Sequence, residues 1–173
     1  MLNIDLDLKR FKPFLKGKIV KASTSNSKDQ PYIWGLIRKK WLIYQPEELI
    51  RQLLIQYLIQ EKKYPKNFIQ VERLLTLHSS SSRSKQLSKR TDILVFDRNM
   101  HPFLMVECKA PEVKMHIDLT KDGALWQSTT YLFGQQTMEV PYLLISNGLQ
   151  SYCCQRNIEK QELDFLDKIP SFP

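Results

Sequence analysis

Two carboxylates and a lysine stand at the ends of two short apolar segments in the middle of the chain. Asp92 precedes the segment ILVF, and Glu107 and Lys109 close the segment FLMVECK. The loop DRNMHP between these segments predicts a hairpin, so antiparallel pairing would bring Asp92 next to Glu107. Because side chains alternate along a strand, Glu107 and Lys109 would share one face while Cys108 points to the other. We therefore expect two carboxylates and one ammonium group to converge.

This group suits metal-assisted hydrolysis of a phosphodiester bond. The oxygen ligands of Asp92 and Glu107 suit Mg²⁺ or Mn²⁺, which keep several waters and complete their shell with substrate phosphate. Lys109 would orient or deprotonate the attacking water, or neutralise charge in the transition state, and the products would be a 3′-hydroxyl and a 5′-phosphate. The alternative is a strand-end salt bridge between Glu107 and Lys109, with Asp92 opening a strand by chance.

A helix is predicted from Pro46 to about residue 64, because apolar residues recur there at helical spacing. Pro46 suits its first turn, and Glu47 and Glu48 suit the positive end of the helix dipole. Glu47 lies nearer the apolar stripe, whereas Glu48 would project to the opposite side. Glu47 is thus the better candidate for an additional metal-binding carboxylate, although both residues could serve only the dipole.

The remaining elements predict a mixed β-sheet flanked by helices, an α/β (α+β) fold. After a strand at 67–77 and an exposed loop at 78–90, a β-meander would continue through the hairpin. A second helix is expected at about 118–138. Strands at 141–146 and 150–155 would be joined by a two-residue turn at Asn147-Gly148, and one short helix could follow residue 157.

Two further groups could contact the site or its substrate. On the second predicted helix, Gln127 and Tyr131 are four residues apart and so share one face, although an ordinary amphipathic helix with a buried tyrosine has the same pattern. The loop at 78–90 and its border supply basic side chains for phosphate contacts, or simply a solvated surface. These side chains belong to Arg83, Lys85, Lys89 and Arg90.

Composition indicates one folded domain, since 42% of the 173 residues are hydrophobic and 25% are charged. The net charge of +8 favours polyanionic partners such as nucleic acid. Three cysteines and three histidines lack zinc-ligand spacing, so we expect a reduced interior and no structural zinc. No apolar run reaches the roughly 20 residues of a membrane helix, and no signal peptide is recognisable. We therefore expect a cytoplasmic protein without a membrane partner.

Six segments in order resemble the N-terminal domain of type I restriction enzyme R subunits, within the PD-(D/E)xK nuclease superfamily. They are RKKWLIYQPEELIRQ, YPKNFIQVE, KRTDILVF, FLMVECKAP, QSTTY and PYLLISNG, between about Ile37 and Asn157. The resemblance implies a restriction-endonuclease-like fold, with a metal and catalytic centre on Asp92, Glu107 and Lys109. It places a QxxxY motif on Gln127 and Tyr131.

The same resemblance implies a helix carboxylate at Glu47 or Glu48 and a nuclease-like domain at 37–157. Residues 1–36, where a basic and polar stretch shows no sustained periodicity, are expected to form an arm or loosely attached lead-in, and 158–173 a tail. Three features depart from the family. The chain has no GxxxxGK[ST] loop for binding ATP, and Leu132 follows Tyr131 where the family often has asparagine. The serine-rich segment before Arg90 is also unlike a compact strand connection.

Three functional hypotheses follow. The first is a Mg²⁺-dependent endonuclease acting on DNA. The second is a non-catalytic module that binds DNA or a partner subunit, and the third is a nuclease that acts only with a separate helicase or specificity subunit. A homodimer would be the simplest route to cutting both strands.

Overall fold

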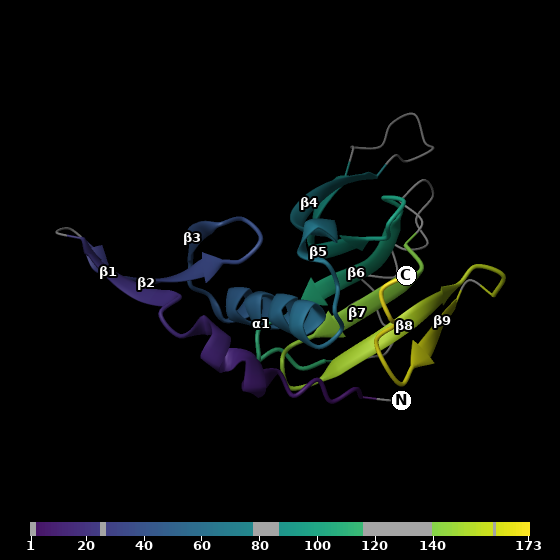
Figure 1. Cartoon of the computed structure of the whole chain (residues 1–173), viewed down its shortest axis with the longest axis horizontal. Helices are drawn as coiled ribbons and strands as arrows, with labels where there is room; N and C mark the ends of the chain where they lie inside the picture. The colour runs from purple at the N-terminus through teal and green to yellow at the C-terminus, as the bar shows by residue number, and fades with distance from the viewer. Residues whose placement is uncertain (1–2, 25–26, 78–86, 116–139, 161) are drawn as a thin grey trace.

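The computed structural model describes residues 3–24, 27–77, 87–115, 140–160 and 162–173 (Figure 1). Its elements, in chain order, are the 3₁₀ helix Leu8–Leu15, β1 (Ile19–Thr24), β2 (Ser27–Gly35), β3 (Lys40–Ile43), α1 (Pro46–Gln60), the 3₁₀ helix Lys66–Phe68, β4 (Ile69–Leu77), β5 (Leu87–Phe96), β6 (Pro102–Cys108), β7 (Tyr142–Ser146), β8 (Ser151–Asn157) and β9 (Glu162–Leu166). Within these ranges the strands form two sheets.

The larger sheet is mixed, as the sequence predicts. Among the described residues its strand order is β4-β5-β6-β7-β8-β9, and every neighbouring pair is antiparallel except β6 and β7. Parallel neighbours need a crossover connection, which here runs from Cys108 to Tyr142. The helix expected at 118–138 falls outside the described residues.

Helix α1 packs its apolar side against this sheet. The predicted start at Pro46 is confirmed, and the helix ends at Gln60, four residues before the predicted end. Lys63, with φ of 59°, then turns the chain toward the buried Tyr64. Figure 1 shows α1 between the N-terminal 3₁₀ helix and the main sheet. The main-sheet residues buried in its core cluster are Ile69, Ile93, Val95, Leu104, Val106, Cys108, Leu144 and Cys153.

Strand β6 is central and apolar on both faces, as predicted for the strand that carries Glu107. Leu104 and Val106 belong to the cluster beneath α1, whereas Met105 belongs to a second cluster on the opposite face. The other strand residues of this second cluster are Leu94, Phe96, Leu143, Ile145, Tyr152 and Cys154. The sheet therefore holds Glu107 at the end of a strand that cannot shift register without exposing its core residues.

Three predicted boundaries are wrong. Strand β5 begins at Leu87, so 87–90 is strand and not loop. The turn between β7 and β8 contains four residues, because Ser146 pairs with Ser151. The tail forms β9 and not a short helix, since its backbone pairs with β8 while Leu163 and Phe165 pack on the second cluster.

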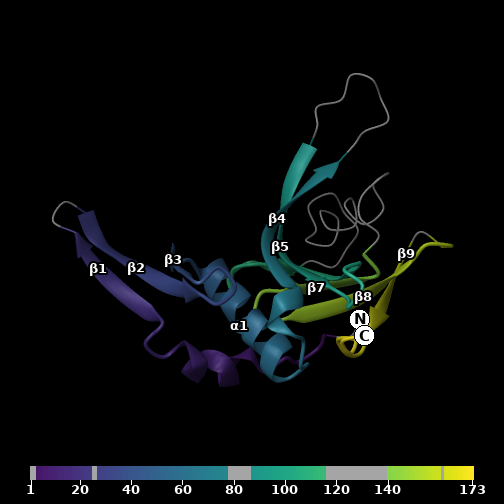
Figure 2. The ribbon, with the colours of Figure 1, turned by 45° about the horizontal axis from the view of Figure 1, so that its top comes forward.

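The first 36 residues contribute both core and surface. Leu8, Phe11 and Leu15 of the 3₁₀ helix are buried in the cluster around α1, so this part of the expected loose lead-in is firmly packed. The following residues form the smaller antiparallel sheet β1-β2-β3. Figure 2 shows the β1–β2 hairpin extending away from the main sheet as an arm.

Gly148, in the turn between β7 and β8, is expected to tolerate no side chain. It has φ of 82°, and a Cβ atom would lie 2.4 Å from Cδ1 of Ile50 in α1. Gly148→Ala should therefore lower the free energy of unfolding by about 2 kcal/mol, from backbone strain and overpacking. Gly17→Ala is the matched control, with φ of 72° but no atom within 4 Å. Urea denaturation that shows equal losses for the two variants would contradict a tight contact between the turn and α1.

Candidate active site

The β5–β6 hairpin brings Asp92 and Glu107 to the same end of two paired strands. Ile93 lies opposite Val106, which places Asp92 beside Glu107 in the continuing register. Oδ2 of Asp92 accepts a hydrogen bond from the backbone N–H of Cys108 at 2.6 Å. The hairpin therefore fixes Asp92 against the segment that carries Glu107.

Glu107 and Lys109 form an ion pair at this strand end. Nζ of Lys109 donates to Oε1 of Glu107 at 2.8 Å, and only 20% and 12% of the respective side chains are exposed. Burial lowers the pKa of Lys109, but the charge and hydrogen bond of Glu107, followed by the charges of Asp92 and Glu47, raise it by more. Lys109 is therefore held as an ammonium ion among three carboxylates.

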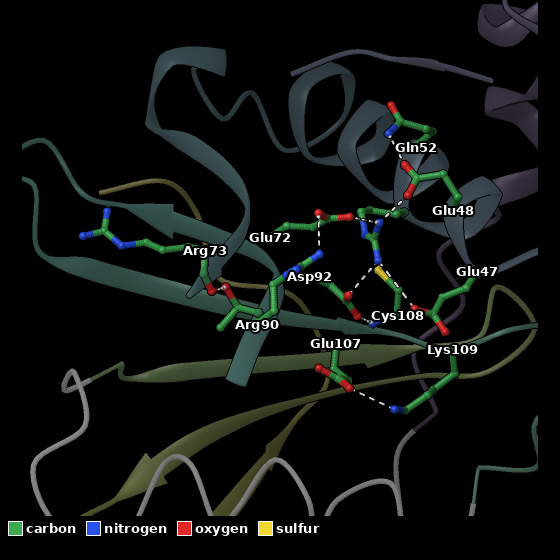
Figure 3. A network of polar contacts seen from close by, with 12 residues as sticks. Glu47, Glu48, Gln52, Glu72, Arg73, Arg90, Asp92, Glu107, Cys108 and Lys109 are labelled. Atoms are coloured by element: carbon green, nitrogen blue, oxygen red, sulfur yellow. Dashed lines mark hydrogen bonds and ion pairs between the residues drawn. The ribbon is translucent and has the colours of Figure 1, made fainter. Parts of the chain in front are cut away.

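The side chains of Glu47, Glu48, Glu72 and Asp92 lie in one polar network, as Figure 3 shows. Arg51 of α1 connects this network to the helix. Its side chain is 9% exposed, and Nη2 donates to Oδ1 of Asp92 at 2.7 Å. It also pairs with Glu48, with Glu72 at 3.3 Å and with Glu47 at 3.5 Å. Burial lowers the pKa of Arg51, but the charges of Asp92 and Glu48 contribute to a net increase. One guanidinium is thus shared by four carboxylates.

Glu47 and Glu48 have different surroundings. Glu48, predicted on the side of the helix opposite the apolar stripe, is buried and accepts hydrogen bonds from Arg51 and from Nε2 of Gln52, because that side of the helix is buried too. Arg51 and Gln52 lie three and four residues further along the helix, and their hydrogen bonds offset the cost of burying the Glu48 carboxylate. Glu47 is 43% exposed, and burial followed by the charge of Asp92 raises its pKa. The charges of Glu107 and Lys109 also act on it.

The sequence did not predict Glu72, which completes the network from β4. Glu72 has φ of 51° inside a strand, between Val71 and Arg73, which pair with Ile93 and Thr91 of β5. Its carboxylate pairs with Arg38, with Arg51 and with Arg90 at 3.2 Å. The left-handed backbone at Glu72 is a conformation that costs energy in a non-glycine residue and is often found near functional sites. Nothing in the amino-acid pattern around it signals this conformation.

The other predicted site residues are only partly described. Arg90 is exposed and contacts Glu72, while Lys89 lies in β5 with its side chain outside the described set. Arg83, Lys85, Gln127 and Tyr131 all lie outside the described residues. Their expected roles remain predictions.

A pocket of about 410 Å³ opens beside the network, between the smaller sheet and the start of α1. Glu47, Arg51 and Glu72 form its polar side, and Tyr32 and Trp41 lie on its other side. The acidic network is therefore accessible from a cleft that is also lined by aromatic side chains.

The donor set suits a divalent cation that binds few protein ligands. Among the described residues, no three His, Cys, Asp or Glu side chains are placed to hold a metal together. Mg²⁺ commonly uses one or two carboxylates, with water and substrate phosphate completing its shell. Asp92 and Glu107, on paired strands and flanked by Glu47, are oxygen donors that fit this requirement. Arg51 and Lys109 are the cations that now neutralise them.

Comparison with known proteins relates this chain to type I restriction enzymes. A family model described as type I restriction enzyme R protein N terminus matches residues 46–170. A solved fragment described as an HsdR subunit of a type I restriction enzyme from Vibrio vulnificus YJ016 is 17% identical over 72% of this chain, with a TM-score of 0.47. This chain spans 23% of that structure's chain. No curated protein matched.

Proposed function

The chain belongs to the type I restriction enzyme R protein N-terminus family, and from this premise we propose that it is a Mg²⁺- or Mn²⁺-dependent endonuclease of PD-(D/E)xK type. Its substrate is DNA, and its site comprises Asp92, Glu107 and Lys109. The observation that carries the proposal is the Glu107–Lys109 ion pair at 2.8 Å, on the strand directly paired with that of Asp92.

Asp92 and Glu107 would hold the metal ion, with Glu47 as the third nearby carboxylate. The ion would supply charge stabilisation and lower the pKa of the attacking water. The hydrogen bond from the Cys108 N–H orients Asp92, and Arg51 holds its other oxygen. Lys109 places a positive charge where negative charge grows on the phosphate oxygens.

The reaction is a simple hydrolysis. The water oxygen forms a bond to phosphorus while the bond from phosphorus to O3′ breaks. The leaving O3′ accepts a proton, and the water loses one to solvent. The products are a 3′-hydroxyl and a 5′-phosphate, without any change of oxidation state.

DNA as the substrate is supported by the family and by the net charge of +8, which favours a polyanion. We further propose helicase and specificity subunits as partners that deliver DNA to this site, as the type I restriction family suggests. Within the described residues, no helix is long and apolar enough to cross a membrane.

Incubation with supercoiled plasmid tests the proposal. Nicking is expected with Mg²⁺ or Mn²⁺ and should stop with EDTA. Glu107→Gln should lower the cleavage rate at least 100-fold, because an amide is a poor substitute for a metal-binding carboxylate. Glu112→Gln is the matched control, since Glu112 is exposed five residues further on.

Equal cleavage by the two glutamine variants would refute this site. If the chain alone does not cleave, calorimetric Mn²⁺ titration decides the metal assignment. Mn²⁺ binding that is lost in Glu107→Gln and kept in Glu112→Gln would support a metal site that cleaves DNA only together with a partner subunit. Identical titrations would exclude Glu107 as a ligand.

A further inference from the structure

One face of the smaller sheet carries a row of aromatic and aliphatic side chains. Val20 lies opposite Tyr32, Tyr32 lies opposite Ile43, and Trp34 lies opposite Trp41. Residues that face each other in an antiparallel pair project to the same side of the sheet. These five residues therefore form one surface, which we call the aromatic face.

The aromatic face is open to solvent over much of its area. Val20 is 39% exposed, Trp41 44% and Ile43 54%. The rings of Trp34 and Trp41 meet edge to face, with centroids 5.3 Å apart, so the two rings pack against each other. The opposite face contributes Ile33 to the core, where it is fully buried. An exposed apolar group of this kind marks an interaction surface.

The charge around this face favours a polyanion. Residues 18–44 contain six basic residues and one acidic residue, a net charge of +5 out of +8 for the whole chain. Lys39 and Lys40 are exposed just before Trp41, and Lys40 lines the same pocket as Trp41. Aromatic rings interleaved with lysines are the combination by which single-stranded nucleic acid is bound, through base stacking and phosphate contacts.

The aromatic face also adjoins the acidic network that flanks the candidate active site. Tyr32, Trp41 and Ile43 line the pocket of about 410 Å³ whose other side is formed by residues of the acidic network, including Glu47 and Arg51. A strand lying on the face would therefore lead toward the carboxylates through a cleft that already exists.

We propose that the aromatic face binds single-stranded DNA, with bases stacked on Trp41 and Tyr32 and phosphates paired with the neighbouring lysines. The choice of DNA rests on the proposed nuclease function. Bases in a duplex stack on each other and are not available to the rings, so the face selects unpaired nucleotides. The bound strand would be the one that enters the candidate active site.

Fluorescence anisotropy of a labelled oligothymidylate, measured with EDTA so that no cleavage occurs, tests this binding. Trp41→Ala should weaken the affinity by about tenfold, the effect of losing one stacked base. Trp41→Phe should retain most of the affinity, because a phenyl ring still stacks. Phe14→Ala is the control, since Phe14 is 47% exposed on the 3₁₀ helix and does not line this pocket.

The salt dependence of the same binding tests the lysines. Lys40→Ala should reduce the slope of log affinity against log salt by about 0.7, the value for one phosphate contact to a single strand. Equal affinities for Trp41→Ala and Phe14→Ala would overturn the proposal, as expected if the face binds a protein. Because no metal is present, Trp41-dependent binding would support the aromatic face whatever the cleavage and Mn²⁺-titration experiments show, so the two proposals can fail separately.

Discussion

Lys109→Ala is expected to reduce the rate of metal-dependent DNA cleavage by about 10²–10³-fold. Removing one preorganised group that stabilises transition-state charge has an effect of this size. Lys109 is well placed for such an effect, because it is mostly buried and the charges of Glu107, Asp92 and Glu47 keep it protonated. The initial rate of plasmid nicking at saturating Mn²⁺ measures the loss.

The control is Lys114→Ala, which removes the same charge from an exposed position five residues away. Its nicking rate should stay within about twofold of that of the unaltered protein, since an exposed lysine contributes little specific stabilisation. Calorimetry should show that Lys109→Ala binds Mn²⁺ at least as tightly as before, because the ammonium competes with the ion for Glu107. Cleavage by Lys109→Ala at the control rate would show that the Glu107–Lys109 pair is only a strand-end salt bridge without a role in catalysis.

The strands that position the site could be predicted from the sequence because their signals are local. The segments of β5 and β6 are apolar, β-rich and separated by turn residues, so the hairpin and the convergence of Asp92 with Glu107 followed directly. The same applies to β7 and to the start of α1 at Pro46. In these segments local preference and tertiary environment agree.

Strand β9 was not predicted, because there the local preference of the sequence and the tertiary environment disagree. Its sequence, Glu162–Leu166, follows a segment rich in helix-forming residues, and it is too short for alternation to be decisive. Pairing with β8 and packing of Leu163 and Phe165 determine its conformation. A strand fixed by a neighbour has no signal that a reading of local propensity can detect.

Arg51 was missed for a different reason. Helical periodicity identifies apolar positions and assigns the polar ones to solvent, but Glu48, Arg51 and Gln52 are all buried. Their burial depends on mutual hydrogen bonds and on Glu72 and Asp92, which come from other strands. The spacing of Glu47, Glu48 and Arg51 predicts ion pairs along the helix, but it does not reveal that these pairs face the sheet.

This arrangement makes Arg51 a structural requirement of the site. Without it, Glu48 and Asp92 would be negative charges in a partly buried environment, and burying unpaired charge is costly. Arg51 therefore stabilises the fold and also fixes one oxygen of Asp92. Stability and orientation of the site are coupled through one side chain.

Arg51→Met, which roughly preserves side-chain volume, is consequently expected to lower the free energy of unfolding by about 3–5 kcal/mol, the cost of breaking a buried charge network. Arg10→Met is the contrasting variant, because Arg10 pairs with Glu61 at 2.6 Å but both side chains are nearly half exposed. That change should cost less than about 1 kcal/mol. Urea denaturation of the two variants gives the comparison.

Adding Glu48→Gln to Arg51→Met should recover part of the loss, since it removes one of the charges left without its cation. The recovery separates electrostatics from packing: a cavity or a misfitting methionine would leave the double variant no more stable than the single one. Equal costs for Arg51→Met and Arg10→Met would mean that the acidic cluster is hydrated and does not depend on Arg51. The predicted difference of several kcal/mol follows from the 9% exposure of Arg51 against 46% for Arg10.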